Sequence, residues 1–237
     1  MTPENNTIWA VVPAAGAGRR MSANIPKQYL PLGEKTVLEH TLDTLLACRQ
    51  LAGVVVVLSR DDGYWPDLQE RYSSQPLEVV TGGAERCHSV LNGLNHLAGK
   101  VDAEDWVLVH DAARPCVRLT DIDTLINTLS ASLHGGLLGV PVADTMKQVD
   151  SDDRVTATVA REGLWHAYTP QMFRIGQLRA ALQQAIDNDL LVTDEASAME
   201  LAGHQPRMVR GQRDNIKITV PSDLELAAFY LQTRKQS

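Results

Sequence analysis

The stretch VVPAAGAGRRM at residues 11–21 runs from an apolar strand into a loop of small residues that ends in arginines. PKQ at residues 26–28 follows closely and adds a further cation. Gly16 and Gly18 permit close approach of the backbone, so amide N–H groups can point at anionic oxygens. The stretch therefore predicts a loop that binds a polyphosphate directly after the first strand.

The composition describes an ordinary globular protein with an acidic balance. At 237 residues the chain can bury one substantial core, so we expect a single domain over residues 1–237 with a modest insertion. Hydrophobic content is 44% and charged content 22%. The net charge of −7 argues against a general binder of nucleic acid or of anionic membranes. A local basic pocket in such a protein suits a small anion.

Cysteine and histidine usage excludes several kinds of site. Cys48, Cys87 and Cys116 are odd in number and widely spaced, which supports neither a disulfide framework nor a structural zinc site. The 7 histidines show no metal-ligand spacing, and no Ser/His/Asp arrangement can be inferred. Residues 1–7 form no basic region ahead of a long apolar run, so neither export nor membrane insertion is indicated. We expect a cytoplasmic protein.

Short apolar runs alternate with helical patterns along the chain. The predicted strands are residues 8–12, 54–58, 77–80, 106–110 and 136–140. Their near-continuous apolar character indicates a parallel sheet covered on both faces. Helices are expected from a capping box at Thr36 and Glu39, over 85–97, and from about 120. This alternation predicts a doubly wound, mostly parallel α/β sheet with ligands at the carboxyl ends of its strands.

The pattern changes in the second half of the chain. Residues 146–149 and 155–159 flank a polar turn and predict a β-hairpin arm inserted at about 141–165. An isolated hairpin is marginal in water, so we expect the arm to pack on a second subunit, with packing on its own domain as the alternative. The later predicted elements are helices over 175–187, 193–202 and from 221, and a strand near 215–219.

Two common nucleotide-loop patterns do not fit the opening stretch. A dinucleotide-binding loop would carry a small residue in place of Met21, and an acidic residue where Arg60 follows the second strand. A P-loop would end in Gly-Lys-Ser/Thr, which is missing here. The cations Arg19, Arg20 and Lys27 are explained better by phosphate contact than by a solvated loop.

A second charged group, HDAAR at residues 110–114, follows the fourth predicted strand and so lies on the same sheet edge. Asp111 can hold Mg²⁺, which favours one or two carboxylates with phosphate oxygens and waters, although a turn or helix cap would also explain it. Arg114 suggests a second anion. Lys217 alternates with apolar neighbours, so periodicity alone makes it the polar face of a strand.

Several motifs in order along nearly the whole chain resemble the 2-C-methyl-D-erythritol 4-phosphate cytidylyltransferase family. They are residues 13–21, 26–29, 110–115, 144–147, 193–197 and 214–217. The resemblance implies a Rossmann-like nucleotidyltransferase fold, a homodimer through the arm, and dependence on Mg²⁺ or another divalent cation. It also implies two substrates, CTP and a sugar-alcohol phosphate, with transfer of CMP to methylerythritol phosphate and release of pyrophosphate.

The resemblance assigns roles to four cations of this sequence. Arg20 and Lys27 match the residues that stabilise the transition state. Arg161 and Lys217 match those that position the phosphate of the substrate. The attacking group is a phosphate oxygen that is already ionised near neutral pH, so the chemistry needs cations and not a general base.

The remaining assignments concern the metal, the substrate and the nucleotide. Asp111 matches the metal-binding aspartate and a substrate contact, and Arg114 and Thr145 match further substrate contacts. The matching CTP pocket consists of Ala14, Ala15, Gly16, Gly18, Gly83, Ala84, Ser89 and Ala112. Ala84 departs from relatives that carry an acidic residue there, which leaves only the backbone for contacts from that position.

Two rival functions stay open on the sequence. One is a cytidylyltransferase for another polyol phosphate, such as ribitol 5-phosphate, because related enzymes share these motifs. The other is a non-catalytic nucleotide-binding protein. The presence of Arg20, Lys27, Asp111, Arg161 and Lys217 together argues against the second rival.

Overall fold

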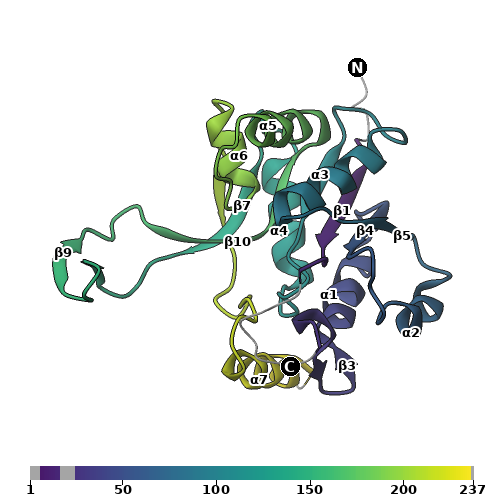
Figure 1. The fold of residues 1–237 in the computed structure, drawn as a ribbon, viewed down its shortest axis with the longest axis horizontal. Helices are drawn as coiled ribbons and strands as arrows, with labels where there is room; N and C mark the ends of the chain where they lie inside the picture. Colours follow the sequence, from purple (N-terminus) through teal and green to yellow (C-terminus); the bar gives the residue numbers. More distant parts are fainter. Residues whose placement is uncertain (1–5, 17–24, 236–237) are drawn as a thin grey trace.

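A seven-stranded sheet with strand order β11-β7-β10-β6-β1-β4-β5 lies at the centre of the protein. The computed structural model describes residues 6–16 and 25–235 (Figure 1). The strands are β1 (Ile8–Pro13), β4 (Gly53–Leu58), β5 (Leu77–Thr81), β6 (Trp106–Val109), β7 (Gly136–Pro141), β10 (Trp165–Arg174) and β11 (Arg207–Arg210). The five strands predicted between residues 8 and 140 are all confirmed.

Strand β1 is the point at which the order of strands reverses. It pairs in parallel with β4 on one side and with β6 on the other. The chain builds outward through β4 and β5 before it returns to add β6 across β1. In open α/β sheets such a switch point leaves a crevice outside the carboxyl ends of the strands. The loops that follow β1 and β6 therefore border the same crevice.

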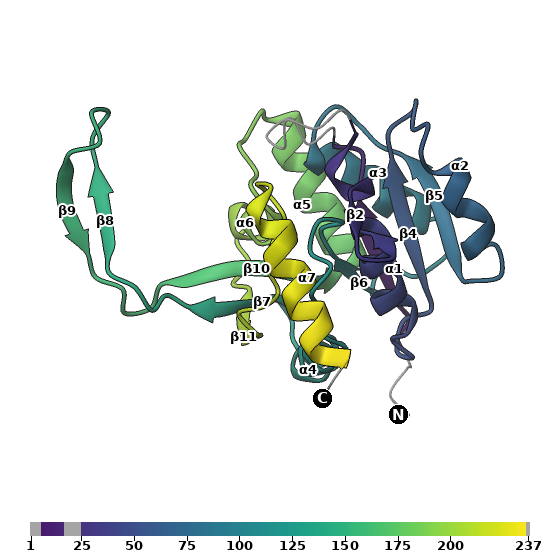
Figure 2. The ribbon, with the colours of Figure 1, turned by 90° about the horizontal axis from the view of Figure 1, so that it is seen from below.

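Helices cover both faces of the sheet (Figures 1 and 2). They are α1 (Val37–Leu46), α2 (Pro66–Gln69), α3 (Arg86–Leu97), α4 (Leu119–Leu129), α5 (Ile175–Asp187), α6 (Glu195–Leu201) and α7 (Ser222–Lys235). Val12 belongs to the core cluster that includes α1 and α4, whereas Val11 belongs to the one that includes α3 and α5. The doubly wound, mostly parallel fold is confirmed. Over residues 6–16 and 25–235, no helix has the length and apolarity needed to cross a membrane.

The predicted capping box of α1 is present. Thr36 Oγ1 accepts a hydrogen bond from the Glu39 N–H at 3.3 Å, and Glu39 Oε2 accepts one from the Thr36 N–H at 2.7 Å. These bonds satisfy two amide groups at a helix start that lacks intrahelical partners. Glu39 is also paired with Arg71 Nη1 at 2.9 Å, which ties the start of α1 to the 3-10 turn after α2.

Strand β10 runs antiparallel to both of its neighbours, β6 and β7. The apolar pattern does not predict this strand, because polar residues such as His166, Thr169 and Gln171 interrupt it. Trp165 of β10 is the register partner of Pro141 at the end of β7. The chain therefore leaves the sheet and re-enters it at one rung.

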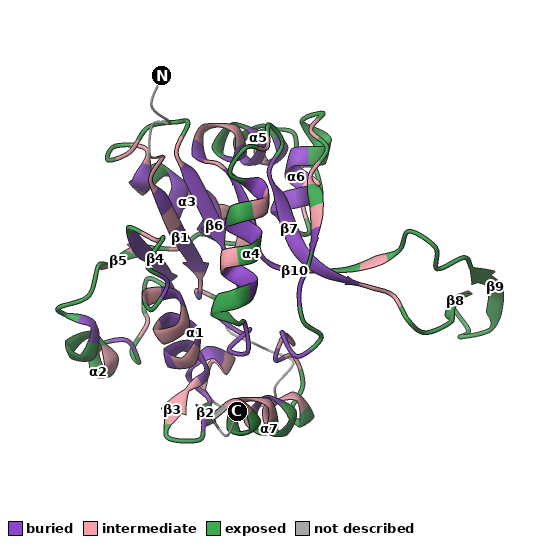
Figure 3. Cartoon of the chain, turned by 180° about the vertical axis from the view of Figure 1, so that it is seen from behind, coloured by how far each residue is buried: buried purple, intermediate pink, exposed green. Residues whose placement is uncertain are grey.

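Between β7 and β10 the chain forms the predicted arm. Its strands β8 (Met146–Val149) and β9 (Val155–Val159) pair antiparallel. Figures 1 and 2 show the arm projecting well away from the sheet, and Figure 3 shows its strands as exposed. Val155 is 61% exposed. The alternative expectation, an arm folded against its own domain, is wrong for this structure.

The predicted strand near residues 215–219 is also wrong. The segment has no regular strand, and its backbone groups bind the loop after β6 instead. Ile218 N–H donates to Ala113 O at 2.8 Å, and Arg114 Nη1 donates to Asn215 O at 2.8 Å. The strand at this end of the sheet is β11, which pairs in parallel with β7. Backbone groups of this segment are thus hydrogen-bonded to the loop and are not available to pair with a neighbouring strand.

Candidate active site

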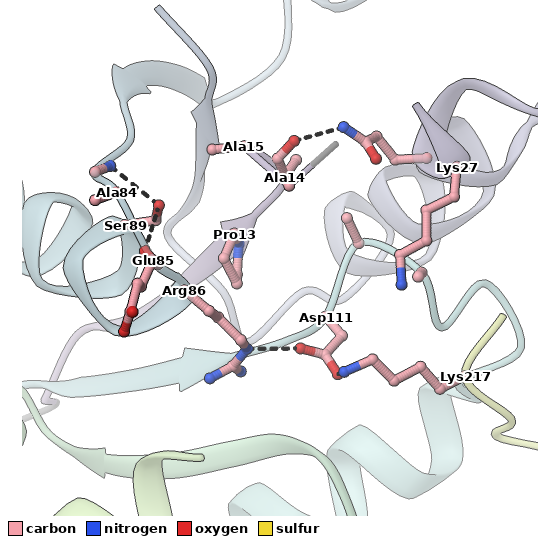
Figure 4. Close-up of a pocket in the computed structure, with 15 residues that line it drawn as sticks. Pro13, Ala14, Ala15, Lys27, Ala84, Glu85, Arg86, Ser89, Asp111 and Lys217 are labelled. Carbon is pink, nitrogen blue, oxygen red and sulfur yellow. Dashed lines mark hydrogen bonds and ion pairs between the residues drawn. The ribbon is translucent and has the colours of Figure 1, made fainter. Parts of the chain in front are cut away.

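A pocket of about 190 Å³ opens at the carboxyl ends of β1 and β6, at the crevice that the topology creates. Segments far apart in the sequence converge on it, and Figure 4 shows their side chains around a common centre. The lining residues are Pro13, Ala14, Ala15, Gly16, Lys27, Gln28, Gly83, Ala84, Glu85, Arg86, Ser89, Asp111, Ala112, Ala113 and Lys217.

Hydrogen bonds to the backbone hold the loop after β1 in place. Ala14 N–H donates to Val57 O of β4 at 2.8 Å. The buried Gln28 donates through Nε2 to Ala14 O at 2.6 Å, which ties the 3-10 helix Lys27–Tyr29 to this loop. Lys27 Nζ lies in the pocket and donates to Ile218 O at 3.2 Å. The cation is therefore anchored beside small residues whose backbone is open to a ligand.

The turn before α3 places backbone groups on the opposite wall. Gly83 N–H donates to Ser89 Oγ at 3.1 Å, and Ser89 Oγ donates to Glu85 O at 3.1 Å. A Cβ on Gly83 would lie 2.4 Å from His88 Cβ, closer than real Cβ contacts allow. Glycine is thus needed here by close approach, and the turn presents the backbone of Gly83 and Ala84 to the pocket.

Asp111 lies on the pocket wall within a cluster of cations. Its Oδ1 accepts from Arg86 Nε at 3.0 Å, and its Oδ2 lies 2.9 Å from Lys217 Nζ and 3.5 Å from Arg114 Nε. Burial alone would raise the pKa of Asp111, but these three cations, Arg86 foremost, outweigh burial and hold the pKa well below its usual range. The carboxylate is therefore ionised at neutral pH.

An ionised carboxylate in a pocket that is also lined by the small-residue loop after β1 fits Mg²⁺, whose preferred ligands are carboxylate, phosphate and water oxygens. A second set of donors lies near the rim of the pocket, where ligand atoms of Glu85, Cys87 and His88 lie within 4.8 Å of one another. Thiol and imidazole ligands suit zinc-like ions better than Mg²⁺. Among the described residues that line the pocket, Asp111 is the carboxylate whose surroundings fit Mg²⁺ best.

Arg86 is a pocket residue that the sequence motifs do not single out. Its Nη1 and Nη2 donate to the two carboxylate oxygens of Glu195 at 2.6 and 2.9 Å, while its Nε donates to Asp111. Glu195 begins α6 and is 1% exposed. The partners lie 109 positions apart, so no local pattern links them. The available signals are a cation at a helix start and a glutamate inside the TDEAS motif.

Two residues of the loop after β6 point inward. Arg114 is buried, donates to Asn215 O, and places its guanidinium carbon 4.8 Å from the centre of the Tyr168 ring. His110 is fully buried between Thr169 Oγ1 at 3.0 Å and Arg114 O at 3.1 Å. Burial lowers the pKa of His110 to about 4, so the imidazole is neutral at physiological pH and supports the loop.

The structure brings most of the predicted site residues together. Those that line the pocket are Ala14, Ala15, Gly16, Lys27, Gly83, Ala84, Ser89, Asp111, Ala112 and Lys217. Within the described chain, Arg114 is not on the pocket lining but packs behind Asp111. Thr145 and Arg161 lie on the exposed arm, where Arg161 donates to Ala143 O. Gly18 and Arg20 lie outside the described residues.

Comparison with known proteins identifies relatives along almost the whole chain. The family model described as "IspD: 2-C-methyl-D-erythritol 4-phosphate cytidylyltransferase" matches residues 8–233. Proteins of that name from Pseudomonas putida and Hahella chejuensis are 54% and 49% identical, covering 92% and 97% of this chain and 93% and 95% of their own lengths. The crystal structure of the Francisella tularensis protein of that name superposes with a TM-score of 0.81 at 37% identity, covering 94% of this chain and 99% of that one.

Proposed function

The chain belongs to the 2-C-methyl-D-erythritol 4-phosphate cytidylyltransferase family, and from this premise we propose that it transfers CMP from CTP to 2-C-methyl-D-erythritol 4-phosphate. The products are 4-diphosphocytidyl-2-C-methyl-D-erythritol and pyrophosphate. It is a nucleotidyltransferase. The observation that carries the proposal for this site is the convergence of Lys27, Arg86, Asp111 and Lys217 on one pocket at the switch point of the sheet.

The reaction is a direct displacement at the α-phosphorus of CTP. An oxygen of the methylerythritol phosphate forms a bond to that phosphorus, and the bond to the oxygen bridging toward the β-phosphorus breaks, releasing pyrophosphate. The attacking phosphate has a second pKa of about 6, so it is largely ionised at neutral pH without a base. The neutral, buried His110 is therefore not required to take a proton.

Repulsion between the two phosphate compounds is the main obstacle, and cations of the chain offset it. Lys27 lies beside the loop after β1 and is assigned to the triphosphate and the departing pyrophosphate, together with Arg20 from the family resemblance. Lys217 is assigned to the attacking phosphate, which it holds in line with the α-phosphorus. Preorganised charges of this kind stabilise the transition state without reorganising during the reaction.

The Ser89 hydroxyl fixes a turn whose backbone faces the pocket. We assign this turn, with Gly83, Ala84 and Ser89, to the cytosine ring. Asp111 is the residue proposed to hold Mg²⁺. A divalent cation held there would supply positive charge to offset that of the phosphates. The protein's own part is to present an ionised carboxylate at a fixed point of the pocket wall.

We further propose a homodimer in which the arm of one protomer completes the pocket of its partner. Thr145 and Arg161 match substrate-binding residues of the family but lie on an arm that extends away from its own sheet (Figure 1). The arm exposes apolar side chains, among them Met146 at 38% and Val149 at 48%. An isolated hairpin gains stability by packing on another surface, and a second copy provides one.

We propose a cytoplasmic location for the enzyme. All three cysteines of the chain lie in the described residues and form no disulfide, as expected of thiols in a reducing compartment.

The single domain with an inserted arm likewise stays our interpretation. A protease that removes the arm while leaving residues 8–140 resistant would support that division of the chain.

The function is tested by following pyrophosphate release from CTP, Mg²⁺ and methylerythritol phosphate, with ribitol 5-phosphate in a parallel reaction. We expect turnover with methylerythritol phosphate and little with ribitol 5-phosphate. Lys27→Ala serves as the matched variant, since it should lose most turnover even at saturating CTP. Absence of product from folded, CTP-binding protein would refute the proposal, and faster turnover of ribitol 5-phosphate would reassign the substrate.

A further inference from the structure

Glu195 fixes the guanidinium of Arg86 through two parallel hydrogen bonds. Its carboxylate oxygens accept from Arg86 Nη1 at 2.6 Å and Nη2 at 2.9 Å. The Glu195 side chain is 1% exposed, and leaving a buried carboxylate without a partner is costly, so its pair with Arg86 matters for stability. A bidentate pair also fixes the plane of the guanidinium. Arg86 is therefore held in one orientation by the start of α6.

The third donor of the same guanidinium reaches Asp111. Arg86 Nε donates to Asp111 Oδ1 at 3.0 Å. Because the nitrogens of a guanidinium share one plane, the orientation that Glu195 imposes is passed on to the Asp111 carboxylate. Figure 4 shows Arg86 and Lys217 approaching Asp111 from opposite sides. Oδ1 is bound by Arg86, and Oδ2 faces Lys217.

Three cations surround Asp111: Arg114 lies behind it with Nε 3.5 Å from Oδ2, and the other two, Arg86 and Lys217, are held differently. Arg86 binds two carboxylates and its side chain is 29% exposed, whereas Lys217 is 38% exposed and approaches Oδ2 with one ammonium group. An ammonium on a flexible four-carbon stem moves away at little cost, but a guanidinium paired with buried Glu195 does not. A divalent cation that binds Oδ2 would therefore displace Lys217, which is nearer to this oxygen than Arg114, and leave Arg86 in place.

We propose that Arg86 is a positioning residue, fixed by Glu195, that orients Asp111 so that Oδ2 meets the metal while Lys217 is released to the attacking phosphate. The inference rests on the function proposed above and deepens it by giving Arg86 and Glu195 a task. Arg86 acts through Asp111 and does not touch the reacting atoms. Disturbing it should change the rate of the chemical step more than the affinity for CTP.

The first test compares Glu195→Gln with the double variant Arg86→Gln/Glu195→Gln. Glu195→Gln keeps the size of the side chain but removes the charge that fixes Arg86. The double variant places a neutral amide at each of the two positions, so it leaves no unpaired charge at the buried position 195 and should retain the fold. We expect kcat to fall about tenfold in Glu195→Gln and about a hundredfold in the double variant, with KM for CTP nearly unchanged.

Electron paramagnetic resonance of Mn²⁺ in the presence of CTP supplies a readout other than turnover. We expect both variants to bind Mn²⁺ about as tightly as the wild type but with an altered spectrum, because the Asp111 carboxylate is no longer held in one orientation. The matched control is Arg71→Gln, which removes a partner of the buried Glu39 outside the pocket. That variant should lose thermal stability and keep both kcat and the Mn²⁺ spectrum.

Two results would overturn the proposal. One is a folded Glu195→Gln enzyme with wild-type kcat and an unchanged Mn²⁺ spectrum. The other is loss of thermal stability and CTP affinity without loss of kcat. That result would mean that the Arg86–Glu195 ion pair only holds α3 and α6 together. Failure of the proposed function is distinguished by the wild type itself, which would then give no product with CTP and methylerythritol phosphate.

Discussion

Lys217 Nζ lies 2.9 Å from Asp111 Oδ2, so the cation assigned to the attacking phosphate is paired with the carboxylate assigned to the metal. Lys217 belongs to a segment without regular secondary structure and is 38% exposed, whereas Asp111 is buried at the end of β6. Two groups with separate proposed tasks thus neutralise each other. Each can exchange its partner for a charged ligand without leaving a buried charge unpaired.

Replacing Lys217 should impair the chemical step. We expect Lys217→Ala to lower kcat by about 10²–10³, the usual effect of removing a preorganised charge-stabilising group. Pyrophosphate release at saturating CTP measures it. The control is Lys100→Ala, which removes an exposed ion pair with Glu78 and should leave kcat unchanged. Near-wild-type turnover by Lys217→Ala would contradict its assigned role.

Replacing Gly83 should weaken nucleotide binding. A Cβ at this position meets His88 Cβ at 2.4 Å, so the turn must shift and the Gly83–Ser89 hydrogen bond is strained or lost. We expect Gly83→Ala to raise KM for CTP about tenfold, as the loss of one or two binding contacts does. Gly99→Ala is the matched control, since a Cβ there meets nothing within 4 Å. Equal KM values for the two variants would show that the turn does not bind CTP.

Asp214 should stabilise the fold in a pH-dependent way. It is paired with Arg118 at 2.5 Å and with Arg234 of α7 at 2.8 Å. Burial alone would raise the pKa of Asp214, but the hydrogen bonds from the two arginines outweigh it and lower the pKa. Because the folded pKa lies below the unfolded value of about 3.9, this stabilisation is present above that pH and is lost as the pH falls through the folded pKa.

We expect Asp214→Asn to lower the free energy of unfolding by roughly 1–2 kcal/mol at pH 7, because the buried carboxylate loses the charge that pairs it with Arg118 and Arg234, whose side chains are themselves 43% and 23% exposed. Urea titrations between pH 7 and pH 2 measure the difference from the wild type, which should shrink at the acid end. Asp152→Asn is the control, since Asp152 and Arg154 are exposed on the arm and 3.6 Å apart. A difference independent of pH would show that the charge of Asp214 is not responsible.

Mixing two inactive variants tests whether the arm acts across a dimer. Arg161→Ala and Lys217→Ala should each be nearly inactive as homodimers. Co-refolded in equal amounts, they should recover about a quarter of wild-type activity, because random pairing gives about half mixed dimers with one intact site each. If Arg161 served its own protomer, each site would still lack one cation and no activity would return.

The sequence predicts the elements of this fold whose apolar pattern is continuous. The predictions of β1, β4 and β6 are correct because both faces of these strands are buried, which gives continuous apolar runs. Val11, Val56 and Leu108, for example, are fully buried. Strand β10 is not predicted because its first residues, next to the arm, are exposed or partly exposed and its later residues are buried, so the strand shows no uniform apolar pattern. Alternation around Lys217 predicts a strand that does not form, since its backbone neighbours are bound to the loop after β6.

The site residues differ in the same way. Those that belong to a local sequence motif are predictable, and those that depend on the packing of distant segments are not. Lys27 and Asp111 are predictable, because each follows a recognisable loop or strand, and the family resemblance adds Lys217. The pairing of Arg86 with Glu195 is not predictable, because it depends on how α3 and α6 pack. Packing of distant segments is a property of the folded core, which no spacing of residues in the chain records.

Pro141 and Trp165 are register partners in β7 and β10, so the arm between them is an insertion whose two ends meet at one position of the sheet. Because the chain departs and returns at adjacent positions of paired strands, residues between them can be lengthened, shortened or exchanged without altering the register of the sheet. A change in the proposed dimer contact therefore need not alter the pocket assigned to the nucleotide. Replacing residues 146–159 by a short turn should give a protomer that lacks the arm and keeps the pocket assigned to CTP.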